Sequence, residues 1–304
     1  MKNAIVTCAT PSWLAPAAVT LLSCTLFKLD QNTELIIVLP EPTAKHFDEL
    51  NIFNAKHNTN IKMLSTETTE FQKIETKQFS IAALLRLKLD KVLQSDYDRV
   101  LYLDSDVLAG SSCMELITAN LAEHPLGAVE DIGSLPWISK KGSGIKNRIG
   151  MELELPYFNS GVLLFDWQQI LEREFLAKCR TVLEKRVDWP FVDQDVLNLC
   201  FAKNWQQLHP KWNIEKKIFG YGFLKPGIRH FTGGQKPWNS PHRIGNKKYH
   251  KFYVDSLKDT PWSTFISPQK RAWPLRPNLL HIIRKLSFLT RRRLIKHFNK
   301  TTNQ

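Results

Sequence analysis

The sequence predicts an α/β fold in which a mostly parallel sheet is covered by helices, and two observations support this prediction. Short apolar runs with strand character alternate along the chain with longer segments of helical period. A chain of 304 residues with 43% hydrophobic and 11% aromatic residues can also bury a core of the required size. This length suits one large domain with an appendage, which we place at residues 1–260 and 261–304.

The expected elements alternate in order along the chain. Strands are expected at residues 4–7, 34–39, 60–63, 99–103 and 161–165. Helices are expected at residues 14–27, 43–51, 80–93 and 194–202. The first helix resembles the apolar segment of a secretion signal, but Pro16 interrupts it and no strongly basic leader precedes it. We therefore expect a buried helix there, and the 5 dispersed cysteines are typical of reduced thiols in the cytoplasm.

Positive charge is concentrated at the end of the chain. Ten Lys and Arg residues and no acidic residue lie between Lys270 and Gln304, which accounts for +10 of the net charge of +13 and leaves +3 for the rest. A nucleic-acid-binding protein would spread its basic surface over the folded body, so we expect no nucleic-acid partner. Apolar residues recur among these charges at helical spacing: Leu279, Ile282, Ile283, Leu286, Leu289, Ile295 and Phe298.

This basic, amphipathic tail is typical of a helix that lies on an anionic membrane surface, with Trp262 and Trp273 as interfacial anchors. RNA binding and merely solvated charge are the alternatives for the tail. Association with the membrane would place the protein in the cytoplasm, peripherally bound to the inner face of the plasma membrane.

Candidate metal ligands follow the expected strand at 99–103. In an α/β sheet, ligands bind beyond the carboxyl ends of the strands, which is where Asp104 and Asp106 stand. Because side chains i and i+2 point the same way, both carboxylates can reach one divalent ion. His230 would complete an oxygen and nitrogen set for which Mn²⁺ is more natural than Mg²⁺, although Mg²⁺ stays possible. Lys236, after a Gly-Gly turn, could neutralise diphosphate oxygens.

Each of these features alone has an ordinary interpretation, such as a solvated turn or a surface histidine. A metal-dependent hydrolase is an alternative that uses the same aspartates, although further carboxylates or a nucleophile beside a base are not visible in the sequence. The chain also has no GxGxxG or P-loop motif after a strand, so a different device must handle phosphate.

Four motifs, in order, resemble those of family 8 glycosyltransferases. They are YLDSDVL at 102–108, YFNSGVLL at 157–164, DQDVLN at 193–198 and HFTGGQKPW at 230–238. The sequence is most similar to bacterial lipooligosaccharide α-galactosyltransferases, with glycogenins as distant relatives, and the likeness covers residues 1–240. It implies a GT-A fold with a Rossmann-like mixed sheet flanked by helices, a UDP-sugar donor, manganese and retention of anomeric configuration.

The resemblance also implies roles for particular residues. Asp104, Asp106 and His230 correspond to the metal ligands, and Lys236 and Gly233 to diphosphate contacts. Further donor-binding positions are Thr7, Thr10, Trp13, Ser105, Arg86, Asn159, Gly161 and Asp131. Thr10 stands where relatives often carry an acidic residue that contacts the nucleotide, which is a departure from the pattern. Trp13 either stacks on uracil or packs in the core.

Asp193 and Gln194 are the candidate catalytic residues. In the family they lie on the face of the sugar opposite the leaving group, where they could stabilise a cationic anomeric carbon. The ordinary interpretation of Asp193 is a cap for the helix that follows it, and this role would not exclude catalysis. A double displacement would require one of the two to bond covalently. Because an amide is a poor nucleophile, we favour attack by the acceptor hydroxyl on the same face, with a UDP oxygen accepting its proton.

The sequence leaves the substrates partly open. The hexose is galactose or glucose, and the acceptor is a glycan or lipid-linked glycan such as lipopolysaccharide or lipooligosaccharide. Residues 140–144 have the composition of a loop, which either closes over the donor or is an inert part of the surface.

Overall fold

The computed structural model describes residues 1–74, 81–131, 140–185, 189–215, 224–239 and 246–266. Seven strands form the main sheet in the order β3-β2-β1-β4-β7-β6-β8. Their bounds are β1 (Asn3–Cys8), β2 (Thr33–Pro40), β3 (Ile61–Thr66), β4 (Arg99–Leu103), β6 (Leu126–Glu130), β7 (Phe158–Asp166) and β8 (Trp205–Gln207). A second sheet pairs β5 (Val107–Ala109) with β9 (Ile228–His230).

The main sheet is mixed, as a GT-A fold requires. Strands β3, β2, β1 and β4 run parallel to one another, whereas β7 is antiparallel to both β4 and β6. The register between β6 and β7 shifts after Ala128, which pairs with Leu163, because the next pair joins Val129 to Asn159. Residues 160–162 of β7 therefore have no partner in β6, and this irregularity lies beside the candidate site.

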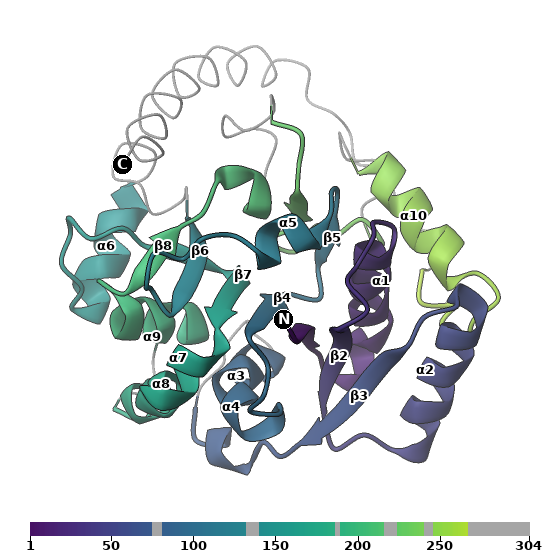
Figure 1. Ribbon diagram of the computed structural model, residues 1–304, viewed down its shortest axis with the longest axis horizontal. Coiled ribbons are helices and arrows are strands. Elements are labelled where there is room, and N and C mark those ends of the chain that lie inside the picture. Colours follow the sequence, from purple (N-terminus) through teal and green to yellow (C-terminus); the bar gives the residue numbers. More distant parts are fainter. Residues whose placement is uncertain (75–80, 132–139, 186–188, 216–223, 240–245, 267–304) are drawn as a thin grey trace.

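Helices cover both faces of the sheet (Figure 1). On one face, α1 (Leu14–Thr25), α2 (Ala44–His57) and α10 (Lys247–Leu257) share an apolar cluster with Ile5 of β1. Val6, the next residue of β1, belongs to the cluster of the other face, because successive strand residues point to opposite sides. That cluster includes residues of α3 (Ala82–Leu85), α4 (Leu89–Val92), α7 (Trp167–Glu172), α8 (Phe175–Leu183) and α9 (Val192–Phe201).

The expected helix over 80–93 is broken. Ser80 lies outside the described residues, and the rest forms α3, a 3-10 turn (Arg86–Lys88) and α4. Arg86 and Lys88 are both buried, and each side chain donates to the backbone carbonyl of another segment, Arg86 to Ser160 and Lys88 to Glu67. We attribute the break to these tertiary contacts, which override the helical period of the sequence.

Several further elements differ from the expectation. The segment 140–144 belongs to α6 (Lys140–Ile149), so its interpretation as a loop is wrong. The short strands β5, β6, β8 and β9 were not predicted, and neither were α5 (Cys113–Ile117), α7, α8 and α10. The strand expected at 99–103 has these bounds as β4, and the other expected strands and helices are present with bounds shifted by up to six residues.

The first helix is buried, as expected: residues 14–24 are all inaccessible to solvent or nearly so. Within the described ranges, every helix is too short or too polar to cross a lipid bilayer. All five cysteines are free thiols in the structure.

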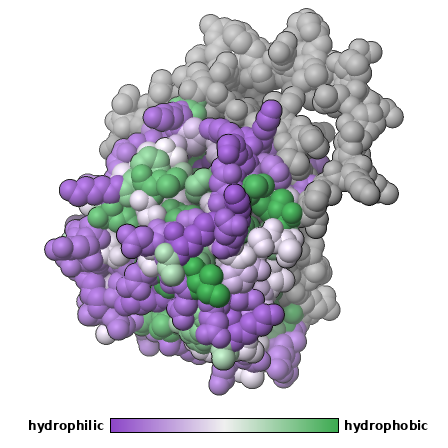
Figure 2. Space-filling view, turned by 90° about the vertical axis from the view of Figure 1, so that its right-hand side faces the viewer, coloured by the Kyte–Doolittle hydropathy of each residue, from purple (hydrophilic) through white to green (hydrophobic). Residues whose placement is uncertain are grey.

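Residues 267–304 of the basic tail, Trp273 included, lie outside the described residues. The preceding segment packs against the body, since Trp262 is only 8% exposed and contacts Phe53 with a ring-centroid distance of 5.3 Å. The expectation that Trp262 anchors the protein in a membrane interface is therefore wrong. The face of the molecule that carries α2 and α10 is mainly hydrophilic, with separate apolar areas (Figure 2).

Candidate active site

Strand pairing brings the candidate metal ligands together. Asp104 follows β4, and its backbone N–H donates to the carbonyl of Gly161 in β7 at 2.8 Å. Asp106 immediately precedes β5, whose antiparallel partner β9 places His230 opposite Val107. The imidazole is thus delivered beside the two carboxylates by backbone register.

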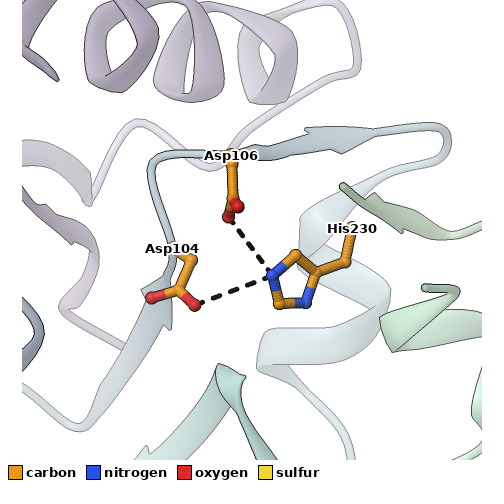
Figure 3. Close-up of side chains that lie close together, drawn as sticks. All are labelled: Asp104, Asp106 and His230. Carbon is orange, nitrogen blue, oxygen red and sulfur yellow. Dashed lines mark ion pairs between the residues drawn. The ribbon is translucent and has the colours of Figure 1, made fainter. Parts of the chain in front are cut away.

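The three side chains converge on one point (Figure 3). His230 Nε2 lies 3.2 Å from Asp106 Oδ1 and 3.7 Å from Asp104 Oδ2. One ligand atom of each residue lies within 4.8 Å of the other two. Two carboxylates and an imidazole form a mixed oxygen and nitrogen set of the kind that binds divalent first-row ions.

Gly161 keeps this convergence point open. A Cβ atom added at Gly161 would lie 2.2 Å from His230 Cε1 and 2.7 Å from Asp104 Oδ2. Neither distance is compatible with a real side chain, so any other residue would displace the imidazole or the carboxylate. The predicted role of Gly161 beside the site therefore has a steric basis, and the residues present fit a bound cation.

Lys236 supplies positive charge to the same place. Its ammonium forms an ion pair with Asp106, donates to the carbonyl of Phe231 at 2.6 Å, and lies 5.8 Å from the centre of the Trp13 ring. Burial opposes ionisation of Asp106, but His230 and Lys236 outweigh it and hold the pKa of this carboxyl well below its usual range. The side chain of Asp106 is therefore held as a carboxylate anion.

Arg86 connects Asp104, one of the candidate metal ligands, to the candidate catalytic pair. One terminal nitrogen donates to Asp104 Oδ1 at 2.7 Å, the other donates to the carbonyl of Ser160 at 2.6 Å, and Nε lies 3.2 Å from Asp193 Oδ2. The guanidinium also lies 4.5 Å from the centre of the Tyr102 ring. Arg86 is only 4% exposed, so its guanidinium has little contact with solvent and instead orients the carboxylates of Asp104 and Asp193.

Asp193 and Gln194 are held against β7 by Ser160. The Ser160 hydroxyl donates to Asp193 Oδ2 at 3.0 Å, and the Ser160 backbone N–H donates to Gln194 Oε1 at 3.0 Å. The amide nitrogen of Gln194 donates to Asp131 Oδ2 at 3.0 Å. The structure thus brings Asp131 into contact with Gln194 of the candidate catalytic pair.

The carboxyl group of Asp193 is hard to ionise. Burial raises its pKa to about 6, Arg86 opposes the shift, and the negative charge of Asp104 adds to it. The preceding residue, Val192, has a φ of 36°, which is strained for a β-branched side chain. Strain at the start of α9 therefore coincides with the candidate catalytic residues.

The expectation that Asp193 caps its helix is wrong. Helix α9 begins at Val192, so Asp193 is already its second residue. Another carboxylate performs a capping function, because Asp195 accepts the backbone N–H of Phe191 at 2.6 Å. Asp193 is thus left to contact Arg86 and Ser160.

Comparison with known proteins agrees with this geometry. The family model described as glycosyl transferase family 8 matches residues 4–241 of the chain. The chain belongs to this family. The nucleic-acid-binding and hydrolase alternatives have no support among these comparisons.

Related family 8 chains and similar proteins come from several bacteria. General stress protein A of Bacillus subtilis is 24% identical over 80% of this chain and 89% of its own length. The lipopolysaccharide 1,3-galactosyltransferase of Salmonella typhimurium is 27% identical over 62% of this chain, a match that spans 57% of that protein. The crystal structure of galactosyltransferase LgtC with donor and acceptor sugar analogs superposes with a TM-score of 0.72 at 23% identity, covering 86% of this chain and 99% of that one.

The remaining predicted residues of this glycosyltransferase differ in how deeply they are buried. Thr7 is fully buried in β1, and its hydroxyl lacks a hydrogen-bond partner among the described residues. Thr10 is partly exposed, with its hydroxyl 3.1 Å from that of Ser12. Trp13 makes an edge contact with Trp238 at 5.4 Å between ring centroids while keeping part of its surface accessible.

The two turns that carry further predicted contacts are more open. Ser105 lies partly exposed in the turn between β4 and β5. Gly233 is exposed and has a φ of 78°, a conformation that favours glycine, so its turn can aim backbone groups toward a ligand.

Three residues that shape the site of this family 8 chain were not predicted from the sequence. Tyr102 donates its hydroxyl to Asp104 Oδ1 at 2.8 Å, and the i, i+2 rule applied to the aspartates would have predicted this contact. Ser160 was visible inside the YFNSGVLL motif but was not assigned a role. Asn213 contacts His230 Nδ1 at 2.9 Å, and no local signal in the sequence indicates this contact.

Proposed function

We propose that this family 8 glycosyltransferase transfers a hexose from a UDP-sugar with retention of anomeric configuration, using a divalent ion held by Asp104, Asp106 and His230. The observation that carries the proposal is the convergence of these three side chains beside Lys236. The mixed donor set favours Mn²⁺ over Mg²⁺, which prefers oxygen ligands and retains its waters.

The departing diphosphate is the first group that needs stabilisation. A divalent ion bound here would supply Lewis-acid stabilisation of negative charge. Lys236 has the position and charge to contact the diphosphate as well, because its ammonium already reaches Asp106 and lies near Trp13. The partly accessible Trp13 ring is the candidate platform for uracil, and Ser105 and Gly233 offer polar groups from the two neighbouring turns.

The anomeric carbon needs stabilisation of the opposite sign. Asp193 and Gln194 present a carboxylate and a carbonyl oxygen on the side of β7, where Ser160 fixes both. An amide whose oxygen accepts a backbone N–H is poorly suited to nucleophilic attack, which supports electrostatic stabilisation of the cationic carbon over a covalent intermediate. The acceptor hydroxyl then attacks on the face that UDP leaves, and its proton passes to a UDP oxygen.

The acceptor that we propose is a glycan or lipid-linked glycan, including lipopolysaccharide or lipooligosaccharide. Its support is the names of relatives, among which are a lipopolysaccharide 1,3-galactosyltransferase and an Escherichia coli lipopolysaccharide 1,2-glucosyltransferase. These two names also keep both galactose and glucose as candidate hexoses. Asn159, Asp131 and Arg86 are the remaining candidate contacts of the donor.

A donor screen tests this proposal. Thermal stabilisation by UDP-galactose and by UDP-glucose is measured with Mn²⁺, with Mg²⁺ and without metal, and UDP release is then followed with and without an acceptor glycan. We expect metal-dependent stabilisation by one donor and faster UDP release when acceptor is present. Equal binding of UDP-sugars with and without metal would contradict the proposed role of the cluster.

For the basic tail we propose attachment of the enzyme to the cytoplasmic face of the plasma membrane. Deletion of residues 270–304 removes ten positive charges, each worth about 1 kcal/mol near an anionic surface. We expect the truncated protein to leave the membrane fraction during sedimentation while it retains slow hydrolysis of the donor. Unchanged sedimentation would rule out attachment through the tail.

A further inference from the structure

We propose that Asn213 is a positioning residue that fixes the tautomer and orientation of His230, so that the Nε2 lone pair faces the two aspartates. This inference rests on the metal site of the proposed function. Asn213 ends a short 3-10 helix (Pro210–Asn213) and is 2% exposed. The following residue, Ile214, forms two backbone hydrogen bonds with β9. Its N–H donates to the carbonyl of Ile228 and its carbonyl accepts the N–H of His230, each at 3.0 Å.

The backbone N–H of Gly161 determines which way the side-chain amide of Asn159 points. The backbone N–H of Gly161 can only donate, and it does so to the side chain of Asn159 at 3.0 Å. The Asn159 atom that receives this bond must therefore be the carbonyl oxygen Oδ1 rather than the amide nitrogen. The same oxygen lies 2.8 Å from the side-chain amide of Asn213. The atom of Asn213 that faces it must be the donor, Nδ2.

This assignment determines the other end of the Asn213 amide. Its carbonyl oxygen Oδ1 lies 2.9 Å from His230 Nδ1 and can only accept a hydrogen bond. His230 Nδ1 therefore carries the proton. In the neutral imidazole the lone pair is then on Nε2, the nitrogen that lies 3.2 Å from Asp106 Oδ1. A backbone N–H thus sets the polarity of the whole relay from Gly161 to the candidate metal ligand.

Because the relay is buried, it determines the tautomer of the His230 imidazole. Asn159, Asn213 and His230 are 8%, 2% and 3% exposed, so water competes poorly for their polar atoms. An imidazole without the Asn213 oxygen would have to leave its Nδ1–H unpaired in the interior or adopt the other tautomer. The other tautomer directs an N–H instead of a lone pair at a cation.

Two measurements test the proposal. Long-range ¹H–¹⁵N NMR on the metal-free protein at alkaline pH reports the tautomer of His230, assigned with a His230→Gln variant. We expect the Nδ1–H form in the wild type, and an Nε2–H form would overturn the proposal without any variant having to fold. The second measurement is the affinity for Mn²⁺, followed by the electron paramagnetic resonance signal of the free ion.

Two substitutions at one position separate the acceptor from the rest of the side chain. Asn213→Leu keeps the size but removes the acceptor, and we expect the affinity for Mn²⁺ to fall by about 10- to 100-fold. Asn213→Asp restores an acceptor for Nδ1–H, so it should bind Mn²⁺ more tightly than Asn213→Leu even though one carboxylate oxygen faces Asn159 Oδ1. Wild-type affinity in Asn213→Leu would overturn the inference.

Asn198→Leu is the matched control. Asn198 is 0% exposed, and its side chain hydrogen-bonds to β7, the strand that contains Asn159. The side-chain oxygen accepts the N–H of Phe158 at 2.8 Å, and the side-chain nitrogen donates to the carbonyl of Phe158 at 2.9 Å. We expect a lower melting temperature for Asn198→Leu with an unchanged affinity for Mn²⁺. If Asn198→Leu lost as much affinity for Mn²⁺ as Asn213→Leu, the loss in both variants would come from general destabilisation. This result would contradict a positioning role for Asn213. A wild type that binds no Mn²⁺ would instead contradict the proposed function itself.

Discussion

The two halves of the active site are built in different ways. In the half that carries the candidate metal ligands, here called the metal half, Asp104, Asp106 and His230 reach one point because β5, which follows β4 after a short turn, pairs with β9 in a particular register, and Gly161 leaves space between them. In the catalytic half, Gln194 is held by side-chain hydrogen bonds to Ser160 and Asp131 at the strained start of α9. The first half is organised to receive a charged ligand, whereas the second is organised to keep its own groups in place.

The largest expected effect tests the metal half. Asp104→Asn and Asp106→Asn each remove a negative ligand, and we expect transfer to fall by about 10³-fold with a parallel loss of affinity for Mn²⁺. Asp96→Asn, which removes an exposed carboxylate paired with Lys2, is the control and should leave both unchanged. Full activity in Asp106→Asn would mean that this half does not bind the metal.

The catalytic half is tested through the ionisation of Asp193. Because its pKa is raised to about 6, transfer should increase as the pH rises through this value, and Asp193→Asn should lose the increase and about 10²-fold in rate. Its affinity for Mn²⁺ should change much less than its rate. A wild-type pH profile retained in the variant would assign the titration to another group.

The same ionisation has a cost in stability, with the opposite dependence on pH. Between the ordinary value of 3.8 and about 6, the folded chain holds a proton on Asp193 that the unfolded chain releases. The contribution of this group to the free energy of unfolding therefore decreases as the pH rises through this window. Denaturant titrations at several pH values give the free energy of unfolding as a function of pH. The slope of this free energy against pH should differ between the wild type and Asp193→Asn only in this range.

A smaller effect is expected from filling the space at the metal half. In Gly161→Ala the added methyl group must displace His230 or Asp104, so we expect a loss of stability of about 1 to 3 kcal/mol and weaker binding of Mn²⁺. The control is Gly234→Ala, where an added Cβ meets no heavy atom of the described residues within 4 Å. Equal affinities in the two variants would show that the site has more room than the structure gives it.

The smallest effect concerns the nucleotide. If the exposed part of Trp13 stacks on uracil, Trp13→Ala should raise the KM for the UDP-sugar by about tenfold, with kcat little changed. Its affinity for Mn²⁺ in the absence of nucleotide should stay at the wild-type level. An unchanged KM would leave Trp13 with a packing role against Trp238 alone.

The sequence predicted the chemistry of the site better than the way it is assembled. The spacing of Asp104 and Asp106 after a strand indicated a shared ion, because alternating side chains point the same way. His230 is distant in the sequence, and it was predicted as the third ligand only from the Gly-Gly turn and lysine that follow it and from the family resemblance. Its delivery by the three-residue strands β5 and β9 was not predictable, since strands this short have no readable period.

Long-range packing accounts for the other differences. The apolar run of β7 identifies a strand but not its direction, so the antiparallel pairing with β4 could not be inferred. Burial of Arg86 and Lys88 interrupts a segment whose local pattern is helical. Asn213 is invisible for the same reason, because its importance comes from a partner that lies on another element.

The sheet formed by β5 and β9 is short, and this has a thermodynamic consequence. Only three residue pairs join these strands, while β9 ends at His230 and the segment that follows it carries Lys236. Docking of this segment and capture of a cation are therefore linked equilibria, each of which strengthens the other. A cation bound here would stabilise the docked position of this segment, so amide hydrogens of β9 should exchange more slowly when Mn²⁺ is present.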